Sequence, residues 1–406
     1  MDSDRKLMGS RVASLRKERG MSQKELAAEL GRSESWVSQV ERGVLPVDRL
    51  SMLQALADAL RVSIQDIRGV EEGTPQGQEP EEYQNDLEGV RLVITGHPAL
   101  TAVFGTQQLD KPVELSDLRE RVDKAWKLVH AASYGELSEE LSALIPALEG
   151  HVRRSSVEPE AYGLLARAYQ AAASTLARQD EHDAAWVAAD RAMQAAERAG
   201  LPLEVVAGVF RLAHTFLRIG RLDQAEHAAE GAVDALRTQW EAGTLPVEGK
   251  SLFGALCLVC AVISAREGDR AGTHRWIDRA REIAEEIGED RNDFGTEFGP
   301  TNVGVHAVST SVDLGDAGMA LDLATGVDTS GLSPERQSRF LLDQARAYTQ
   351  RRQVGEAVKA LLNGEKLAPE QVRTHPLARQ TIRDLIQLSR TPSADLVALA
   401  ERAAVA

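Results

Sequence analysis

Polar side chains of the types that recognise nucleic acids cluster between residues 22 and 43. Those suited to base edges are Glu34, Ser35, Trp36, Ser38 and Gln39. A glutamine can pair bidentately with adenine, a carboxylate can accept from cytosine, and an aromatic ring can contact the methyl group of thymine. Those suited to phosphates are Gln23, Ser33 and Arg42. The candidate chemistry is sequence readout in a major groove, provided that one exposed helix presents the first set.

The sequence offers no comparable set for catalysis or for a metal. It contains no nucleophile-and-base combination, no phosphate-binding glycine loop and no paired histidine spacing. Cys257 and Cys260 form a CxxC pair inside a thirteen-residue apolar run, which favours buried, unreactive thiols over a redox centre. His130, His214 and His306 are typical of packed helix residues. We therefore predict that the chain is not an enzyme and uses no cofactor or metal.

Helix signals surround the polar cluster and would position it. A first helix is expected over 10–19, and Ser22 with Glu25 forms a capping box that starts a second. Gly31 supplies a tight turn before a third helix capped by Ser33, and further helices are expected from residue 48 and over 63–66. The inward face is formed by Val12, Leu15, Leu26, Ala27, Leu30, Val37 and Val40. Two helices joined by a short glycine turn are typical of a helix-turn-helix.

These motifs resemble the phage Cro/C1 repressor (XRE) family. The match covers about residues 8–68 and rests on 23–27, Gly31, Ser33 and 37–43. The resemblance implies a five-helix domain in which Gln23 opens the second helix and contacts the DNA backbone. It implies that the third helix enters the major groove, and that Arg16 and Glu41 form an ion pair between the first and third helices.

Two observations complicate this interpretation. The same domain could bind a protein, with Trp36 as an interface aromatic, and Glu34 is tolerated near DNA only where it pairs well. Residues 1–70 carry 12 basic and 10 acidic side chains, so their non-specific affinity for DNA should be modest. Two such N-terminal domains in a dimer, bound to an inverted-repeat operator, would supply tight, specific binding.

Charge is distributed unevenly along the chain of 406 residues. Residues 1–70 have a net charge of +2, and the remainder supplies the rest of the overall −15. The segment 71–82 reads EEGTPQGQEPEE, has no aliphatic residue and should be a solvated linker. We predict a helix-turn-helix domain over 1–70, a linker and connecting helix over 71–112, and a repeat domain over 113–406. DNA should repel the acidic part, which confines contact to the first domain.

Small residues recur in the C-terminal part with offsets of 7, 5 and 7. The five frames begin at Ala173, Ala213, Ala261, Val308 and Ala345. Each frame is typical of a helix, a short turn and a second helix, and further pairs are expected over 115–154 and 375–404. The pattern resembles a degenerate tetratricopeptide (TPR) repeat. It implies an all-α chain whose larger part is a solenoid with a concave groove.

Positions six and three before each frame residue, and one after it, should face this groove. They are Arg167, Gln170, Ser174, Phe210, His214, Leu258, Val262, Asn302, Val305, Ser309, Arg339, Leu342 and Arg346. We select as ligand-binding residues Arg167, Gln170, Phe210, His214, Asn302, Arg339 and Arg346. Arginines in an acidic domain suit an anionic group such as a peptide carboxylate, and Asn302 can clamp an amide. The alternative is that these are ordinary solvated helix residues.

Residues 289–301 interrupt the repeats with acids, glycines and two phenylalanines. They form either a longer connection or a lid whose Phe294 and Phe298 fold over the groove.

The combination of an N-terminal helix-turn-helix domain with helical repeats resembles two groups of regulators. One comprises peptide-sensing receptors of the Rap/PlcR type. The other is a large set of actinobacterial regulators with an XRE head and a repeat body, to which segments 298–303 and 332–336 are similar. The resemblance implies that the body senses a signal or mediates dimerisation.

We therefore expect a cytoplasmic, homodimeric transcription regulator that binds double-stranded DNA. A peptide or small-molecule effector in the groove would control it. The alternative is a protein-interaction adaptor that captures a partner protein in the groove. The sequence has no apolar run of 18 residues, so no membrane partner is expected.

Overall fold

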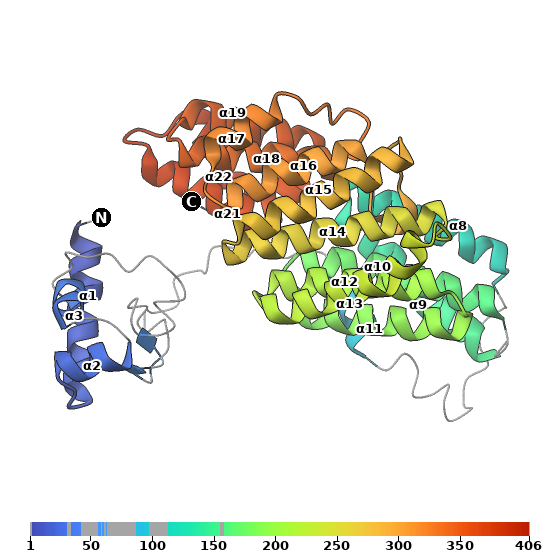
Figure 1. Cartoon of the computed structure of the whole chain (residues 1–406), viewed down its shortest axis with the longest axis horizontal. Helices are drawn as coiled ribbons and strands as arrows, with labels where there is room; N and C mark the ends of the chain where they lie inside the picture. The colour runs from blue at the N-terminus through green and yellow to red at the C-terminus, as the bar shows by residue number, and fades with distance from the viewer. Residues whose placement is uncertain are drawn as a thin grey trace. The chain divides into compact units, whose positions relative to one another are not determined.

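The computed structural model describes residues 2–30, 34–41, 56–57, 59–60, 62, 87–96, 113–154 and 158–405. Within these residues the regular elements are helices, one isolated bridge joins Arg291 and Phe298, and there is no strand (Figure 1). The all-α prediction is confirmed. Contacts divide the chain into two compact units, Met1–Pro80 and Glu81–Ala406, which we call the head and the body.

Three helices of the head are described: α1 (Asp2–Glu18), α2 (Gln23–Glu29) and α3 (Glu34–Glu41). α1 begins well before residue 10, because Gly9 is tolerated inside it and acidic residues suit a helix N-terminus. Gly20 ends it with a φ of +70°. The Glu25 N–H donates to the Ser22 hydroxyl at 3.1 Å, and the Ser22 N–H donates to the Glu25 carboxylate at 2.7 Å. The capping box is confirmed.

An apolar core fixes α1, α2 and α3 against one another. Its buried members are Val12, Leu26, Ala27, Val37, Val40, Leu56, Ala57 and Leu60. The inward positions expected on α2 and α3 are thus confirmed at Leu26, Val37 and Val40. Most of the fourth and fifth helices expected from the sequence lies outside the described residues.

The body begins with α6 (Glu88–Thr95), which packs against α9 and α11. The other body helices are α8 (Leu115–Ala131), α9 (Tyr134–Arg154), α10 (Pro159–Arg178), α11 (His182–Ala199), α12 (Pro202–Arg218), α13 (Leu222–Glu241), α14 (Val247–Glu267), α15 (Arg270–Ile287), the short 3-10 helix η1 (Asp293–Gly295), α16 (Pro300–Asp313), α17 (Ala317–Ala324), α18 (Pro334–Gln350), α19 (Val354–Leu367), α20 (Pro369–Thr374), α21 (Pro376–Leu388) and α22 (Ala394–Arg402). Consecutive helices pack as pairs, and the five expected repeats are α10–α11, α12–α13, α14–α15, α16–α17 and α18–α19.

One backbone feature recurs at the turn of every repeat. The second frame position has a positive φ in each case: Asp180 (63°), Gly220 (74°), Gly268 (81°), Gly315 (84°) and Arg352 (58°). A left-handed residue lets the chain reverse between two packed helices. The frame residues that begin each repeat are all at most 1% exposed, as close helix packing requires. The spacing of 7, 5 and 7 therefore describes a real structural unit.

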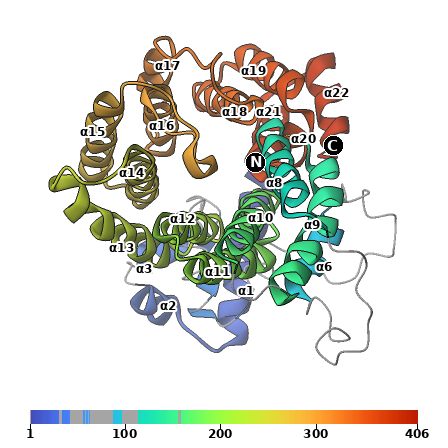
Figure 2. The same ribbon diagram turned by 90° about the vertical axis from the view of Figure 1, so that its right-hand side faces the viewer.

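The repeats do not form an open superhelix. They form a ring that closes where its ends meet (Figure 2). The backbone N–H of Tyr134, at the start of α9, donates to the Glu370 carboxylate of α20 at 2.7 Å. Arg178 of α10 forms an ion pair with Glu335 of α18 at 3.3 Å, and α8 packs against α18. The expected concave groove is thus the inner face of a closed ring, a consequence of repeat curvature that the spacing of small residues does not specify.

Residues 289–301 lie inside this ring and contact helices on several sides of it. Arg211 of α12 donates to the carbonyl of Phe294 at 2.6 Å, and Arg336 of α18 donates to that of Thr296 at 3.1 Å. Phe298 is fully buried and packs against Gly254 of α14. The lid hypothesis is wrong for Phe298, which is a core residue because the missing side chain of Gly254 leaves room for its ring.

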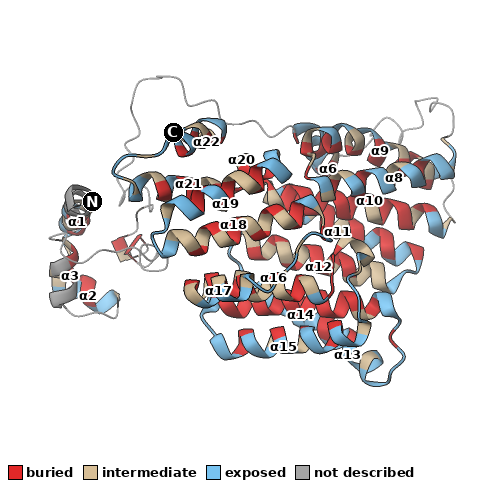
Figure 3. Cartoon of the chain, turned by 90° about the horizontal axis from the view of Figure 1, so that it is seen from above, coloured by how far each residue is buried: buried red, intermediate tan, exposed pale blue. Residues whose placement is uncertain are grey.

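α14 passes through the interior of the body and is buried along most of its length (Figure 3). Cys257 and Cys260 are at most 3% exposed, and burial raises the pKa of the Cys257 thiol to about 12. The prediction of buried thiols is confirmed. Among the described helices, α14 alone has the length and apolar composition of a membrane span, and 78% of that apolar stretch is buried inside the body.

Candidate nucleic-acid interface and ligand pocket

A buried network joins the three described helices of the head. Arg16 of α1 donates through Nε and Nη2 to the two oxygens of Glu41 at the end of α3, the second contact being 3.1 Å. Gln23, the first residue of α2, donates to the same carboxylate at 2.6 Å. Burial opposes ionisation, but the bonds from Arg16 and Gln23 hold the pKa of Glu41 below its ordinary value. The ion pair implied by the family resemblance is present, and it fixes how α3 is presented.

α3 carries the residues expected to read bases. They are Glu34, Ser35, Trp36, Ser38 and Gln39. Because Val37 and Val40 are buried, positions 35 and 39 fall on the opposite side of the helix axis. Ser38 is half-buried. The phosphate candidates Ser33 and Arg42 lie outside the described residues, and Gln23 is engaged with Glu41.

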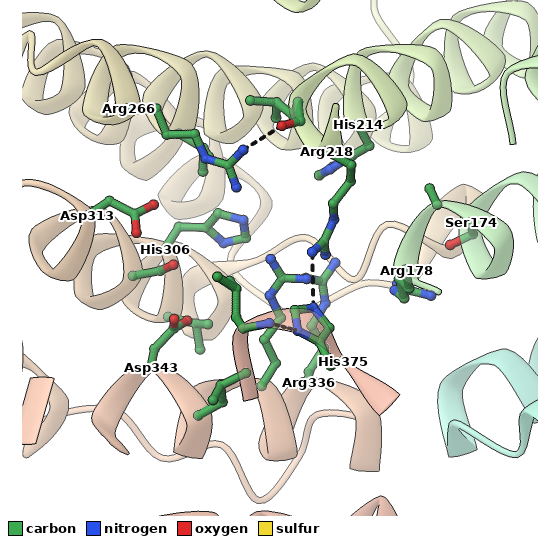
Figure 4. Close-up of a pocket in the computed structure, with 18 of the residues that line it drawn as sticks. Ser174, Arg178, His214, Arg218, Arg266, His306, Asp313, Arg336, Asp343 and His375 are labelled. Carbon is green, nitrogen blue, oxygen red and sulfur yellow. Dashed lines mark hydrogen bonds between the residues drawn. The ribbon is translucent and has the colours of Figure 1, made fainter. Parts of the chain in front are cut away.

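One cavity of the body lies inside the ring and measures about 70 Å³. It is lined by Ala173, Ser174, Ala177, Arg178, Phe210, Arg211, His214, Leu217, Arg218, Val262, Arg266, Val305, His306, Ser309, Asp313, Arg336, Arg339, Leu342, Asp343, Arg346, His375 and Leu377. We call it the arginine pocket (Figure 4). Its walls are the first helices of all five repeats, together with the start of α21.

The ligand residues expected from the sequence divide into three groups. Four line the arginine pocket: Phe210, His214, Arg339 and Arg346. Arg167 and Gln170 line a separate, more open cavity beside Trp126, and the amide of Gln170 donates to Glu204. Asn302 is 1% exposed and lines neither cavity. The first helices of the repeats thus line the arginine pocket, and the seven expected residues do not share one surface.

Five further arginines of the pocket were missed. They are Arg178, Arg211, Arg218, Arg266 and Arg336. Three of them, Arg178, Arg218 and Arg266, stand five residues after Ala173, Ala213 and Ala261. That position lies one helical turn beyond the last inward position predicted for each of these helices. Extending the inward stripe by one turn would have found these three residues.

Four carboxylates lie on or beside the arginine pocket, and they pair with only three of its seven arginines. Arg346 contacts Asp313 at 2.7 Å and Asp343 at 2.9 Å. Arg178 and Arg336 share Glu335, and Arg336 also faces Glu297 at 3.4 Å. Burial opposes ionisation of Glu335, but Arg178 and Arg336 lower the pKa of its carboxyl group to about 2.

The other four arginines have no carboxylate within ion-pair distance among the described residues. They are Arg211, Arg218, Arg266 and Arg339. Burial, and then repulsion by neighbouring arginines, lowers the pKa of Arg211 and of Arg218 to about 9. The same two causes hold the pKa of His214 and of His375 well below the ordinary value, so both imidazoles are neutral. The pocket therefore concentrates positive charge that the protein leaves unneutralised.

Comparisons with known proteins agree with the architecture of the head. Residues 7–68 match the model of a helix-turn-helix domain family. An uncharacterized HTH-type transcriptional regulator of Sinorhizobium fredii is 38% identical over 73 residues, which make up 18% of this chain and 94% of the relative. A crystal structure of Bacillus thuringiensis PlcR in complex with the peptide PapR7 and DNA aligns over 95% of this chain and all of that one, at 11% identity and a TM-score of 0.30. That likeness is too distant to support a conclusion.

A helix-turn-helix held by a buried ion pair thus occurs in a chain whose head matches such a regulator over nearly that protein's whole length. No group of three or more metal-ligating side chains occurs within the part of the chain that the structure describes. The chain belongs to the helix-turn-helix family of DNA-binding transcriptional regulators.

Proposed function

We propose that this regulator binds an inverted-repeat operator as a cytoplasmic homodimer and that a ligand in the body controls it. Residues 1–70 would read DNA, 71–112 would connect, and 113–406 would sense the ligand and pair the subunits. The observation that supports this most is the Arg16–Glu41–Gln23 network, which holds α3 in a defined position relative to α1 and α2. A pre-positioned recognition helix loses little conformational entropy on binding its groove.

In this proposal α3 supplies the base contacts and flanking residues supply the phosphate contacts. Positions 35 and 39 lie opposite the buried valines, where they would meet base edges, with Glu34, Trp36 and Ser38 around them. Ser33 and Arg42 would hold phosphates at the two ends of the helix. Gln23 would need to keep its bond to Glu41 while its free amide oxygen, or the N-terminus of α2, faces the DNA backbone.

Control by a small ligand is supported by the arginine pocket. It is enclosed by all five repeats, so a ligand bound there would contact the first helix of each. Such a ligand can change the curvature of the whole ring, because the ring consists of packed units joined at turns. A protein adaptor that captures a partner needs an open groove. Ring closure through Tyr134 and Glu370 leaves less room for such a partner than an open solenoid would.

The decisive experiment is selection of DNA sequences by the full-length protein, followed by fluorescence anisotropy on the selected site. We expect a palindromic consensus, a salt-sensitive complex and a stoichiometry of two chains per site. Analytical ultracentrifugation of the free protein would test the dimer separately. Selection that enriches no sequence would contradict the proposal, and a partner protein recovered by a head-deleted chain after DNase treatment would favour the adaptor.

A further inference from the structure

Two N–H donors meet the ring of His375 inside the arginine pocket, and the ring can accept a hydrogen bond from only one of them. The ring of His375 caps α21, because its Nδ1 accepts a hydrogen bond from the backbone N–H of Leu377 at 3.2 Å. A neutral imidazole has one N–H and only one ring nitrogen that can accept. Nε2 of the same ring is 3.0 Å from Nη1 of Arg218. Both ring nitrogens of His375 therefore lie at hydrogen-bond distance from a donor, and the neutral ring can accept from only one of the two (Figure 4).

Other donors in the pocket are also unmatched. Nη1 of Arg178 and Nε of Arg211 are buried and have no hydrogen-bond partner. Arg339 is half-buried and makes no hydrogen bond or ion pair with any described residue. A buried donor without an acceptor costs free energy, and a buried cation without an anion costs more. A protein keeps such a set where a bound group completes it.

Charge and volume restrict what this group can be. A single carboxylate binds one arginine bidentately or two singly, which would leave two of the four unpaired arginines without an anion. A group with two negative charges and several oxygens can serve all four. A cavity needs about 10–15 Å³ to hold one water molecule, and the arginine pocket measures about 70 Å³. The space therefore suits a group of a few heavy atoms. Phe210, Val262 and Leu342 line the rest of the pocket and suit an apolar remainder.

We propose that the arginine pocket binds a small molecule through a dianionic oxyanion group, either a phosphate or a pair of carboxylates. Its oxygens accept from Arg218 and Arg339, and the neighbouring arginines complete the neutralisation. This inference deepens the proposed function, and its regulatory meaning depends on that function. The binding itself does not, since it concerns the body alone.

The probes are inorganic phosphate, succinate and acetate, added to the full-length protein without DNA. Isothermal titration calorimetry at constant ionic strength, balanced with sodium chloride, separates site binding from screening. We expect saturable binding of phosphate or succinate at least about 10-fold tighter than that of acetate, because a second charge and further oxygens meet arginines that one carboxylate cannot reach. Phosphate and succinate together distinguish a phosphate ligand from a dicarboxylate one.

Two variants and one control locate the site. Arg218→Ala and Arg339→Ala should each weaken binding by about 10-fold or more. Arg275→Ala removes an arginine of α15 whose side chain is 72% exposed and outside the pocket, and it should leave binding unchanged. The ligand-free Arg339→Ala protein should melt no lower than the wild type, because Arg339 has no partner to lose. Retained stability with reduced binding separates a binding residue from a structural one.

Several outcomes would overturn the assignment. They are the absence of saturable phosphate and succinate binding, equal affinity for acetate, and wild-type affinity in both pocket variants. A lower melting temperature of ligand-free Arg339→Ala would also contradict it. A protein that binds phosphate at this site yet selects no DNA sequence would contradict the proposed function alone.

Discussion

The guanidinium of Arg178, at the end of α10, lies 3.3 Å from the carboxylate of Glu335 at the start of α18. The first of these helices opens the first repeat and the second opens the fifth. The two side chains are 13% and 1% exposed, so this ion pair is almost dry. It closes the ring at the same place where α20 meets α9. The curvature of the solenoid is therefore fixed by contacts between residues more than 150 positions apart, a separation that no local pattern encodes.

Replacing Glu335 with alanine should destabilise the body strongly. The change leaves Arg178 and Arg336 without their shared carboxylate in a buried place, which typically costs about 3–5 kcal/mol. Urea unfolding followed by circular dichroism would measure the loss. Asp234→Ala is the matched control, since its ion pair with Arg237 is exposed and should be worth less than about 1 kcal/mol. Equal effects of the two substitutions would show that ring closure does not depend on Glu335.

The contribution of Glu335 should vanish in acid. Its pKa is about 2 in the folded protein and about 4.3 in an unfolded chain. A carboxyl group with a depressed folded pKa stabilises the protein above the unfolded value, and this stabilisation is lost as the pH falls towards 2. The two-unit difference corresponds to about 3 kcal/mol. The stability difference between wild type and Glu335→Gln should therefore shrink as the pH falls from about 5 to about 2.

Comparison with the variant is essential, because His214, His306 and His375 also have lowered pKa values. Burial is the main cause in each. These histidines destabilise both proteins alike as the pH falls below about 6.5. A wild-type-minus-variant difference that stays constant over the range would contradict the assigned role of Glu335.

Substitutions on and beside α3 should separate base readout from phosphate binding. Gln39→Ala should relax the preference at one operator position, with a loss of about 1–3 kcal/mol on the preferred base. Arg42→Ala should weaken all sequences alike and reduce the slope of log affinity against log salt by about 1. Anisotropy on the selected operator and on its single-base variants measures both. Ser14→Ala, at an exposed position of α1, should change neither quantity.

Much of this architecture follows from local patterns. The capping box of Ser22 and Glu25 forms as expected, because its two hydrogen bonds span only three residues. The small frame residues pack as expected because helix periodicity alone aligns them. The expectation about Phe298 failed for the opposite reason. Its environment is Gly254 of a helix 44 residues earlier, and a distant cavity leaves no signal near the residue that fills it.

For the same reason, the sequence predicts only part of the candidate site. Arg339 and Arg346 were found because they follow the inward stripe of one helix. Arg211 lies two residues before Ala213, off the stripe that was used. It faces the interior because residues 289–301 enter the ring and offer it the carbonyls of Phe294 and Gly295. His375 precedes α21, outside the five repeats, and lines the pocket with Leu377.

The packing of Phe298 on α14 yields a prediction with an internal control. A methyl group added by Gly254→Ala would collide with the Phe298 ring, and overpacking of this kind typically costs about 1–3 kcal/mol. Gly231 also lies inside a helix, but a methyl group there would meet nothing within 4 Å. Gly231→Ala should instead stabilise α13 by up to about 1 kcal/mol. Thermal unfolding of both variants measures the difference, and two stabilising changes would show that Phe298 does not occupy this space.

Substitutions at the left-handed turn residues should change the stability of the body in opposite directions. Asp180 and Arg352 adopt a conformation that costs a side-chain-bearing residue about 1–2 kcal/mol. Glycine removes this cost but gives the unfolded chain more freedom, so Arg352→Gly should stabilise the body by a few tenths to about 1 kcal/mol. Gly220→Ala should destabilise it by about 1 kcal/mol, because alanine is strained at a φ of +74°. A methyl group there would meet no atom within 4 Å, so a clash adds nothing to this cost. Urea unfolding of the two variants should move in opposite directions. Destabilisation by both would mean that contacts of the Arg352 side chain, and not its backbone conformation, decide its effect.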